Sequence, residues 1–391
     1  MSMASRREYV NTMSQRYRSA KSRREKSALI DEVVEVLGFH RKHAARVLRK
    51  PLSLERPPRT RRKRRKYLES LPVIEVVWEA LDYCCAERLH PVLLSTAEQI
   101  ARHGSVVLTD LVRRQLAEIS RATLARRLAE MPSPRARKLA GRQRPGSALR
   151  SEVPLGRYDW NEGRPGALEL DLVEHNGGSS LGQFAYTLSV VDVVSGWVGH
   201  RAVLGRGQTG VHQAVGSILD QWPFTPWGLH TDNGTEFLNA QLLRFARARG
   251  LQFTRSRPYC KNDNPHVEQK NLQLVRNVVG YARYDTPADV EWLNQVYALL
   301  DVYVNLFLPS RKLVSKTRSG AKVQKRYDTA RTPFQRLCEA GVLDPATQAA
   351  LQRQIDACNP LAVYRKLQSL INAGPQAALS APTPPRKEVA D

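Results

Sequence analysis

Three acidic residues, Asp171, Asp232 and Glu268, are spaced so that their carboxylates could share one metal site. Asp171 lies in the apolar alternation LELDLV, which predicts a β-strand. Asp232 opens the turn DNG after the short apolar piece WGL, and Glu268 lies in the helix-forming run VEQKNL, with 35 residues between these two acids. Mg²⁺ prefers oxygen ligands in octahedral geometry and keeps positions open for water and substrate phosphate. Two strand ends and one helix could therefore present the ligands of a pair of such ions.

Several blocks around these acids resemble a known family. The segments LELDLVEHNGG, SVVDVVSGW, HTDNGTEF and KNDNPHVEQKN occur in this order within residues 168–309. Together they resemble the DD35E catalytic core of retroviral integrases and of bacterial insertion-sequence transposases, with the ISNCY group as the nearest subgroup. The resemblance implies an RNase H-like fold and metal-dependent DNA cleavage, followed by transfer of a 3′-hydroxyl to target DNA.

The same resemblance implies a role for each acid. Two Mg²⁺ ions, which Mn²⁺ could replace, would clamp the attacking and leaving oxygens on opposite sides of the phosphorus. Asp171 would bridge both ions, Asp232 would bind one ion, and Glu268 would bind the other. Retroviral integrases carry an N-terminal zinc-binding domain, and this sequence shows no such ligand set.

Other residues near the three acids compete for a role in the site. Glu169 shares a strand face with Asp171 and could be a ligand or a neighbour, and Asp192 could equally form a turn. Histidines near the proposed ligands could assist, although hard-cation sites prefer oxygen and such histidines more often pack or bond a carboxylate. The remaining alternatives are Glu174, Glu236, Asp263, His175, His230 and His266.

Composition points to a polyanionic partner. The 391 residues include 61 Lys and Arg against 37 Asp and Glu, a net charge of +24, which attracts phosphate backbone. We therefore expect double-stranded DNA as partner. The absence of a long apolar run argues against a membrane span, and five scattered cysteines without metal spacing predict free thiols and a cytoplasmic protein.

Residues 1–58 are predicted to form an N-terminal helix-turn-helix. Two helical patterns within residues 26–50 are separated by Gly38-Phe39, and the second pattern is basic. This arrangement is typical of a helix that enters the DNA major groove, and a plain helical hairpin with a solvated basic face is the alternative. The expected DNA-binding side chains are Arg41, Lys42 and Arg46.

Residues 59–131 are predicted to form a basic arm followed by a second helix-turn-helix unit. Ser120 is expected to cap the last helix of this unit. The basic residues of that helix, expected to contact DNA, are Arg121, Arg126 and Arg127. Residues 132–165, rich in Pro, Gly, Arg and Lys, are expected to be a basic linker.

Residues 166–309 are predicted to form the catalytic core, an α/β domain with a mixed five-stranded sheet and flanking helices. Period-two patterns predict strands at 167–173, 184–191, 197–204, 227–232 and 252–255. Helical patterns at 210–221 and 240–249 separate the later strands, and Glu268 opens a further helix. Side chains near Glu268 that are expected to meet phosphates are Arg255, Arg257, Lys261, Lys270 and Arg276.

The chain after the core is predicted to be basic and helical over residues 310–373, with a disordered tail at 374–391. A transposase must hold two DNA ends at once, so the resemblance also implies a homo-oligomer on DNA. Two other functions fit the same residues. One is a nuclease of the same fold that only hydrolyses DNA, and the other is a non-catalytic DNA-binding regulator.

Overall fold

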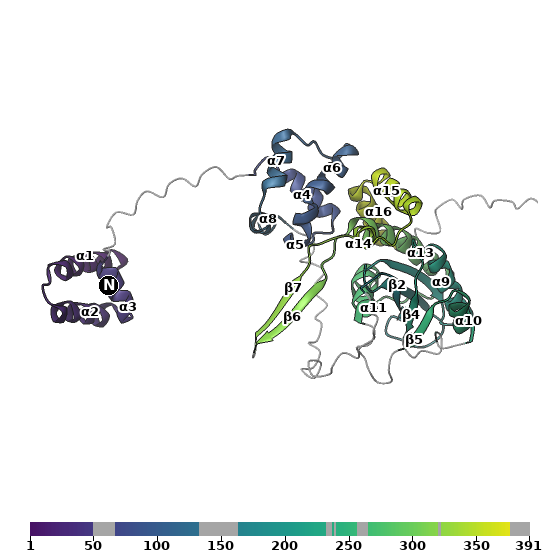
Figure 1. Ribbon diagram of the computed structural model, residues 1–391, viewed down its shortest axis with the longest axis horizontal. Helices are drawn as coiled ribbons and strands as arrows, with labels where there is room; N and C mark the ends of the chain where they lie inside the picture. Colours follow the sequence, from purple (N-terminus) through teal and green to yellow (C-terminus); the bar gives the residue numbers. More distant parts are fainter. Residues whose placement is uncertain are drawn as a thin grey trace, which may run out of the picture. The chain divides into compact units, whose positions relative to one another are not determined.

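The computed structural model describes residues 1–49, 67–132, 163–231, 237, 240–255, 265–319 and 322–375 (Figure 1). Contacts divide the chain into two units, Met1–Lys66 and Tyr67–Asp391. Several predicted features lie outside the described residues, namely the basic run 59–66, most of the linker, the tail beyond residue 375, and the side chains of Asp232, Arg257 and Lys261.

The first unit contains three helices around a small apolar core. Gly38 adopts a left-handed conformation (φ 68°) that ends the second helix, as glycine does at many helix C-termini. Val10, Met13, Val33 and Leu48 are buried together, so the first helix packs on the two that the sequence predicted. The helices are α1 (Met3–Ser19), α2 (Arg23–Leu37) and α3 (Arg41–Arg49).

A mixed five-stranded sheet forms the centre of the second unit. Its order is β3-β2-β1-β4-β5; β1, β2 and β3 are antiparallel neighbours, whereas β4 and β5 run parallel to β1. This arrangement confirms the predicted RNase H-like fold. The strands are β1 (Ala167–Glu174), β2 (Ala185–Asp192), β3 (Val198–Leu204), β4 (Gly228–Thr231) and β5 (Gln252–Arg255).

Helices cover the two faces of this sheet. On the face of Leu170, α9 (Gln208–Asp220) approaches so closely that a Cβ at Gly199 would stand 2.7 Å from Ile218 Cγ2. On the opposite face, which carries Asp171, Tyr297 of α13 (Pro287–Val302) hydrogen-bonds Thr187 of β2 at 2.8 Å. The other helical segments of the core are α10 (Ala240–Ala248), α11 (Pro265–Lys270), η4 (Asn271–Arg276), α12 (Asn277–Val279) and η5 (Tyr303–Phe307).

Helices before and after the sheet share a second apolar cluster. Leu361, from the end of the chain, is buried among side chains of residues 73–128. Ser120 caps its helix as predicted, because its Oγ accepts the N–H of Thr123. The helices before the sheet are α4 (Leu71–Ala80), α5 (Ala86–Leu89), η1 (His90–Val92), α6 (Leu93–Arg102), α7 (Asp110–Glu118) and α8 (Arg121–Leu128), and those after it are α14 (Pro333–Ala340), α15 (Pro345–Ala357) and α16 (Pro360–Ala373).

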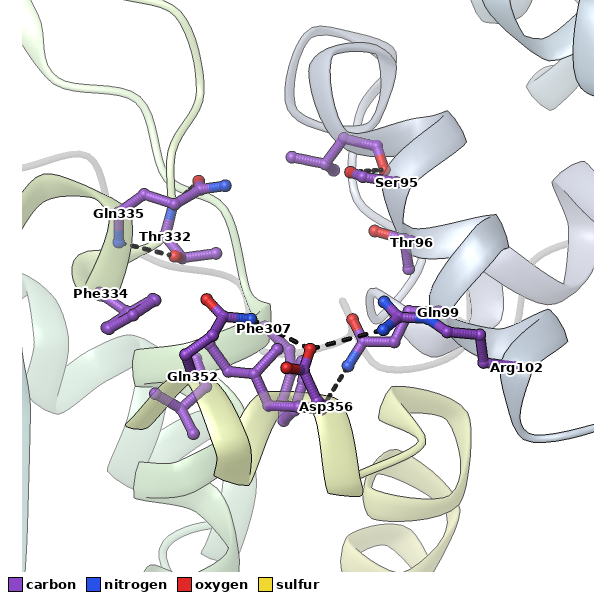
Figure 2. Close-up of a pocket in the computed structure, with 13 residues that line it drawn as sticks. Ser95, Thr96, Gln99, Arg102, Phe307, Thr332, Phe334, Gln335, Gln352 and Asp356 are labelled. Atoms are coloured by element: carbon purple, nitrogen blue, oxygen red, sulfur yellow. Dashed lines mark hydrogen bonds and ion pairs between the residues drawn. The ribbon is translucent and has the colours of Figure 1, made fainter. Parts of the chain in front are cut away.

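A polar seam joins α6 to α15, and Figure 2 shows the pocket beside it. The Gln99 amide donates to the backbone carbonyls of Ile355 (2.7 Å) and Cys358 (3.0 Å), so both hydrogens of one buried amide are satisfied across the seam. Arg102 and Asp356 add a more exposed pair at 3.5 Å, which contributes little in water. The lining of this pocket includes neither Asp171 nor Glu268, so it is separate from the predicted acid site.

Within residues 310–373, which the sequence predicted to be basic and helical, a two-stranded antiparallel ribbon forms first. Its strands are β6 (Leu313–Ser319) and β7 (Lys322–Tyr327). The helical prediction is therefore wrong over residues 313–327 and holds only from α14 onward, because this segment pairs as two strands instead of forming a helix. None of the helices in the described ranges is long and apolar enough to cross a membrane.

Candidate active site

The central strand β1 presents two carboxylates on one face. Glu169 is 6% exposed, and its Oε2 accepts the backbone N–H groups of His266 and Val267, each at 2.9 Å. These donors belong to the first turn of α11, whose amides have no partner within the helix. A strand carboxylate therefore fixes the start of the helix that carries Glu268.

Burial raises the pKa of Glu169 to about 7, although its two backbone hydrogen bonds oppose the shift. The negative charges of Glu268 and Asp171 also contribute to this rise in the pKa of Glu169. Both predicted ligands are thus close enough to Glu169 to act on its ionisation. The two backbone hydrogen bonds of Glu169 fit the role of a neighbour that holds the helix, one of the two roles that the sequence left open.

Asp171 is half-buried and contacts the same helical segment one turn further on. Its Oδ2 accepts a 2.7 Å hydrogen bond from the side-chain amide of Asn271, and its Oδ1 accepts the N–H of Leu172 at 2.9 Å. Asn271 follows Glu268 by three residues, and residues at this spacing lie on the same side of a helix. The Asp171–Asn271 bond therefore holds the turn that carries Glu268 beside β1.

Asp232 lies outside the described residues, so its place relative to the other two acids stays a prediction. It follows Thr231, the last residue of β4, which runs parallel to β1 with His230 beside Glu169. Among the described residues no three metal-binding side chains form a cluster; two of the three predicted acids belong to that part of the chain.

The donor set suits a hard divalent cation. Asp171 and the exposed Glu268 offer carboxylate oxygens, and such oxygens are the ligands that Mg²⁺ prefers. The Oδ1 atom of Asn271 is buried and has no hydrogen-bond partner among the described residues, so it is one further oxygen near Asp171.

The described histidines of this region are engaged elsewhere. His175 is fully buried and its Nε2 bonds Thr187 at 2.8 Å, while His230 Nδ1 bonds Thr254 at 2.8 Å. Burial lowers the pKa of His175 to about 3, so this imidazole is a neutral part of the core. The side chain of His266 is exposed at the start of α11.

The rival acids also have other roles. Asp192 is fully buried and accepts hydrogen bonds from Gly166 N (2.6 Å), Ser195 N (2.5 Å) and Ser195 Oγ (2.6 Å). These bonds confirm the alternative in which Asp192 forms the turn. Glu174 is exposed and accepts the Asn176 amide at 3.2 Å. Glu236 and Asp263 lie outside the described residues.

The predicted DNA-binding residues of the helical regions lie on exposed helices. On α3, Lys42 and Arg46 are exposed, whereas Arg41 forms an ion pair with Asp31 of α2. On α8, Arg121 and Arg126 are exposed and Arg127 pairs with Glu130 at 3.1 Å.

The predicted phosphate contacts of the core are less uniform. Arg276 is half-buried over the ring of Tyr281, and Arg255 is placed by its backbone, as the partner of Thr231 in β5. Lys270 is half-buried; desolvation and, after it, nearby positive charges, Lys312 first among them, together lower its pKa to about 8. Lys270 thus belongs to a cationic cluster at the far side of the helix that carries Glu268.

Sequence reasoning missed two residues of this region. Asn271 could have been found from its spacing of three residues from Glu268, because both then lie on one helix face. Lys312 reaches the carbonyl oxygens of Val193 and Val194 through its Nζ, and this contact between distant segments leaves no signal in the sequence.

Comparisons with known proteins identify one strong relative. The uncharacterized protein y4rM of Sinorhizobium fredii is 39% identical over 341 residues, which cover 86% of this chain and 96% of the relative. No family model matches the chain. Among solved structures, the catalytic core domain of BIV integrase is 18% identical and covers 45% of this chain and 95% of its own length, with a TM-score of 0.31. The HTLV-2 integrase catalytic core domain in complex with magnesium is 14% identical and covers 38% and 91%, with a TM-score of 0.29.

Proposed function

We propose that this chain, which belongs to the same family as the uncharacterized protein y4rM of Sinorhizobium fredii, is a DNA transposase. It binds the ends of a mobile DNA segment, cleaves them in a metal-dependent reaction and joins the freed 3′-hydroxyl to target DNA. It acts in the cytoplasm on double-stranded DNA, as a homo-oligomer that holds two ends at once.

One contact carries the proposal: the 2.7 Å hydrogen bond between Asp171 and Asn271. It joins the central strand to the helical segment that follows Glu268, and so supports a site on the face of the sheet that carries Asp171. Glu169 supports the same arrangement, because its carboxylate accepts the backbone N–H groups of His266 and Val267 at the start of α11. A site prepared in this way needs little reorganisation when substrate binds.

The acids have separate tasks in this proposal. Asp171, Asp232 and Glu268 would hold two Mg²⁺ or Mn²⁺ ions. When bound, these ions stabilise the attacking and leaving oxygens of the phosphodiester. Asn271 orients the Asp171 carboxylate by donating to one of its oxygens.

Binding of DNA is assigned to basic residues in three regions of the chain. Their positive charge supplies affinity for phosphate, while the two helix-turn-helix segments supply recognition of the DNA ends. The residues are Arg41, Lys42 and Arg46 on α3; Arg121, Arg126 and Arg127 on α8; and Arg255, Arg257, Lys261, Lys270 and Arg276 in the core.

Strand transfer by the purified full-length protein tests the proposal. The substrate is a duplex that carries the terminal sequence of the DNA segment containing the gene, with Mg²⁺ or Mn²⁺ compared with EDTA. We expect joined products from the wild type and a loss of at least about 100-fold in Asp171→Asn, Asp232→Asn and Glu268→Gln, since each removes one metal-binding charge.

Glu174→Gln is the matched control, because Glu174 is an exposed acid at the end of the same strand and accepts a hydrogen bond from the Asn176 amide. Cleavage without joining would identify the protein as a hydrolytic nuclease and contradict the proposed transposase activity. DNA binding with neither cleavage nor joining in Mg²⁺ or Mn²⁺ would identify the protein as a non-catalytic DNA-binding regulator. Full activity of Asp232→Asn would exclude the proposed ligand set.

A further inference from the structure

The ribbon β6–β7 is a basic arm separate from the five-stranded sheet. Its two strands pair with each other in a sheet of their own, and in Figure 1 they extend away from the helices at their base. Every described side chain of 313–318 and 323–327 is exposed. Because these side chains are exposed, burial within the protein does not stabilise the ribbon. An isolated two-stranded ribbon is only marginally stable in water.

The charge of the ribbon has one sign. Residues 313–327, LVSKTRSGAKVQKRY, contain five cations and no acid. The register places Lys316 directly opposite Lys325, and Arg318 lies next to them on the same face, opposite Val323. Like charges directly opposite one another destabilise a β-ladder. The ribbon therefore carries an electrostatic cost that an anionic partner would remove.

The base of the ribbon is firmly attached to the catalytic sheet. Lys312 Nζ donates to the carbonyl oxygens of Val193 and Val194 in the turn between β2 and β3. Asp328, across the ribbon, accepts the Lys312 N–H at 2.7 Å and an Arg336 N–H at 2.6 Å. These contacts give the ribbon a fixed direction relative to the sheet, which a mobile tail would not have.

We infer that the ribbon β6–β7 is a DNA-binding arm whose Lys316–Lys325 face lies against the phosphates of duplex DNA. A two-stranded β-ribbon fits the major groove of B-DNA, and cations along it would neutralise phosphates irrespective of sequence. Exposed apolar groups accompany the cations, with Val314 62% and Val323 44% exposed, and can contact sugars and thymine methyl groups. The inference rests on the proposed function in taking DNA as substrate.

The test uses the full-length double variant Lys316→Thr/Lys325→Thr. Threonine favours strands, and Thr–Thr pairs across strands are stabilising, so the fold should be kept. Binding to a short duplex of arbitrary sequence is measured in EDTA, over about 50–200 mM salt. We expect about tenfold weaker binding and a slope of log K against log salt reduced by about 2, roughly 1 for each lysine removed.

The matched control is Arg353→Ala/Lys366→Ala, which removes two charges from exposed positions on α15 and α16. It should leave the salt slope within about 0.5 of the wild type, because neither cation lies on the ribbon. The thermal midpoint of the ribbon variant should stay the same or rise, because a repulsive pair is removed. Weaker DNA binding together with equal or higher stability is an outcome that a merely structural ribbon would not give.

Two results would overturn the inference. An unchanged salt slope in the ribbon variant would show that these lysines do not meet phosphate. Dissociation of an oligomer in sedimentation without DNA, at unchanged DNA affinity, would make a second copy of the chain the partner. The binding assay contains no metal and measures no chemistry, so it tests the ribbon independently of catalysis. A wild type that binds DNA through the ribbon but never joins it would contradict the proposed transposase activity and still support DNA binding by the ribbon.

Discussion

The side-chain amide of Asn271 donates a 2.7 Å hydrogen bond to Asp171, across 100 residues of sequence. Asp171 lies on the central strand and Asn271 lies one helical turn beyond Glu268. Their bond thus links the two described acids of the proposed site through a residue that is not itself an acid.

Replacing Asn271 by Ala should lower strand transfer about 10- to 100-fold, as is typical for residues that orient metal ligands. The Mg²⁺ concentration for half-maximal activity should rise, because Asp171 loses the donor that orients it. Titration of activity with Mg²⁺ gives the measurement, and Asn277→Ala, at an exposed position on α12, is the control. A variant that loses stability but keeps the wild-type Mg²⁺ dependence would argue against positioning.

Glu169→Ala should destabilise the second unit by about 2–4 kcal/mol, because two N–H groups at the start of α11 lose their acceptor in a buried place. Glu169→Gln retains an acceptor oxygen and should lose less than half as much. Denaturant unfolding at neutral pH distinguishes the two variants. Equal losses in both would mean that the charge, and not the acceptor, is what the helix needs.

His175 should make the protein less stable in acid. Burial, with a smaller contribution from the positive charge of Arg276, lowers its folded-state pKa from 6.5 to about 3, so the unfolded chain binds the proton more readily between these values. The stability contributed by the neutral imidazole is complete above pH 6.5 and is lost as pH falls towards 3. This loss amounts to about 2 kcal/mol at pH 5 relative to pH 8.

Unfolding of His175→Gln across this pH range measures that contribution. The variant should show a shallower decline in stability than the wild type, whatever its absolute stability. His103→Gln, at an exposed position after α6, should follow the wild-type decline. Parallel pH curves for His175→Gln and wild type would show that His175 does not titrate as expected.

Gly199→Ala and Gly210→Ala should change stability in opposite directions. A Cβ at Gly199 would stand 2.7 Å from Ile218 Cγ2 and 3.2 Å from Trp222, and such overpacking costs about 1–3 kcal/mol. A Cβ at Gly210, in α9, meets nothing within 4 Å, and alanine there should add about 0.5–1 kcal/mol. Thermal unfolding of both variants provides the comparison; a stabilised Gly199→Ala would mean that α9 can move away from β3.

The sequence predicted the core sheet well because side chains alternate between the two faces of a strand, and in β1 the apolar residues Leu168, Leu170 and Leu172 fall on the face opposite Asp171. The predicted strand at 167–173 is observed at 167–174, and that at 252–255 is unchanged. Glu169 and Asp171 could be placed on one face for the same reason. The acid trio could be selected by spacing, although Asp232 lies outside the described residues.

Features that depend on contacts between distant segments could not be predicted in this way. The ribbon β6–β7 buries neither face, so its residues show no alternation that would reveal strands. The helix α1 buries Val10 and Met13 as its main core residues, too few to produce a clear periodicity. Glu169 contacts α11, and Lys312 contacts the β2–β3 turn, only because the fold brings together segments 97 to 119 residues apart. No local sequence pattern shows such a contact.

The seam between α6 and α15 has a consequence for synthesis of the protein. The amide of Gln99 bonds carbonyls 256 and 259 residues later in the chain, and Leu361 completes the apolar cluster of α4–α8. Domains that emerge early from the ribosome usually fold first, but these helices gain their last buried contacts only after α15 and α16 have been made. A product truncated before α15 should therefore leave the amide of Gln99 without these two acceptors and part of the apolar cluster exposed, which marks such a product for degradation.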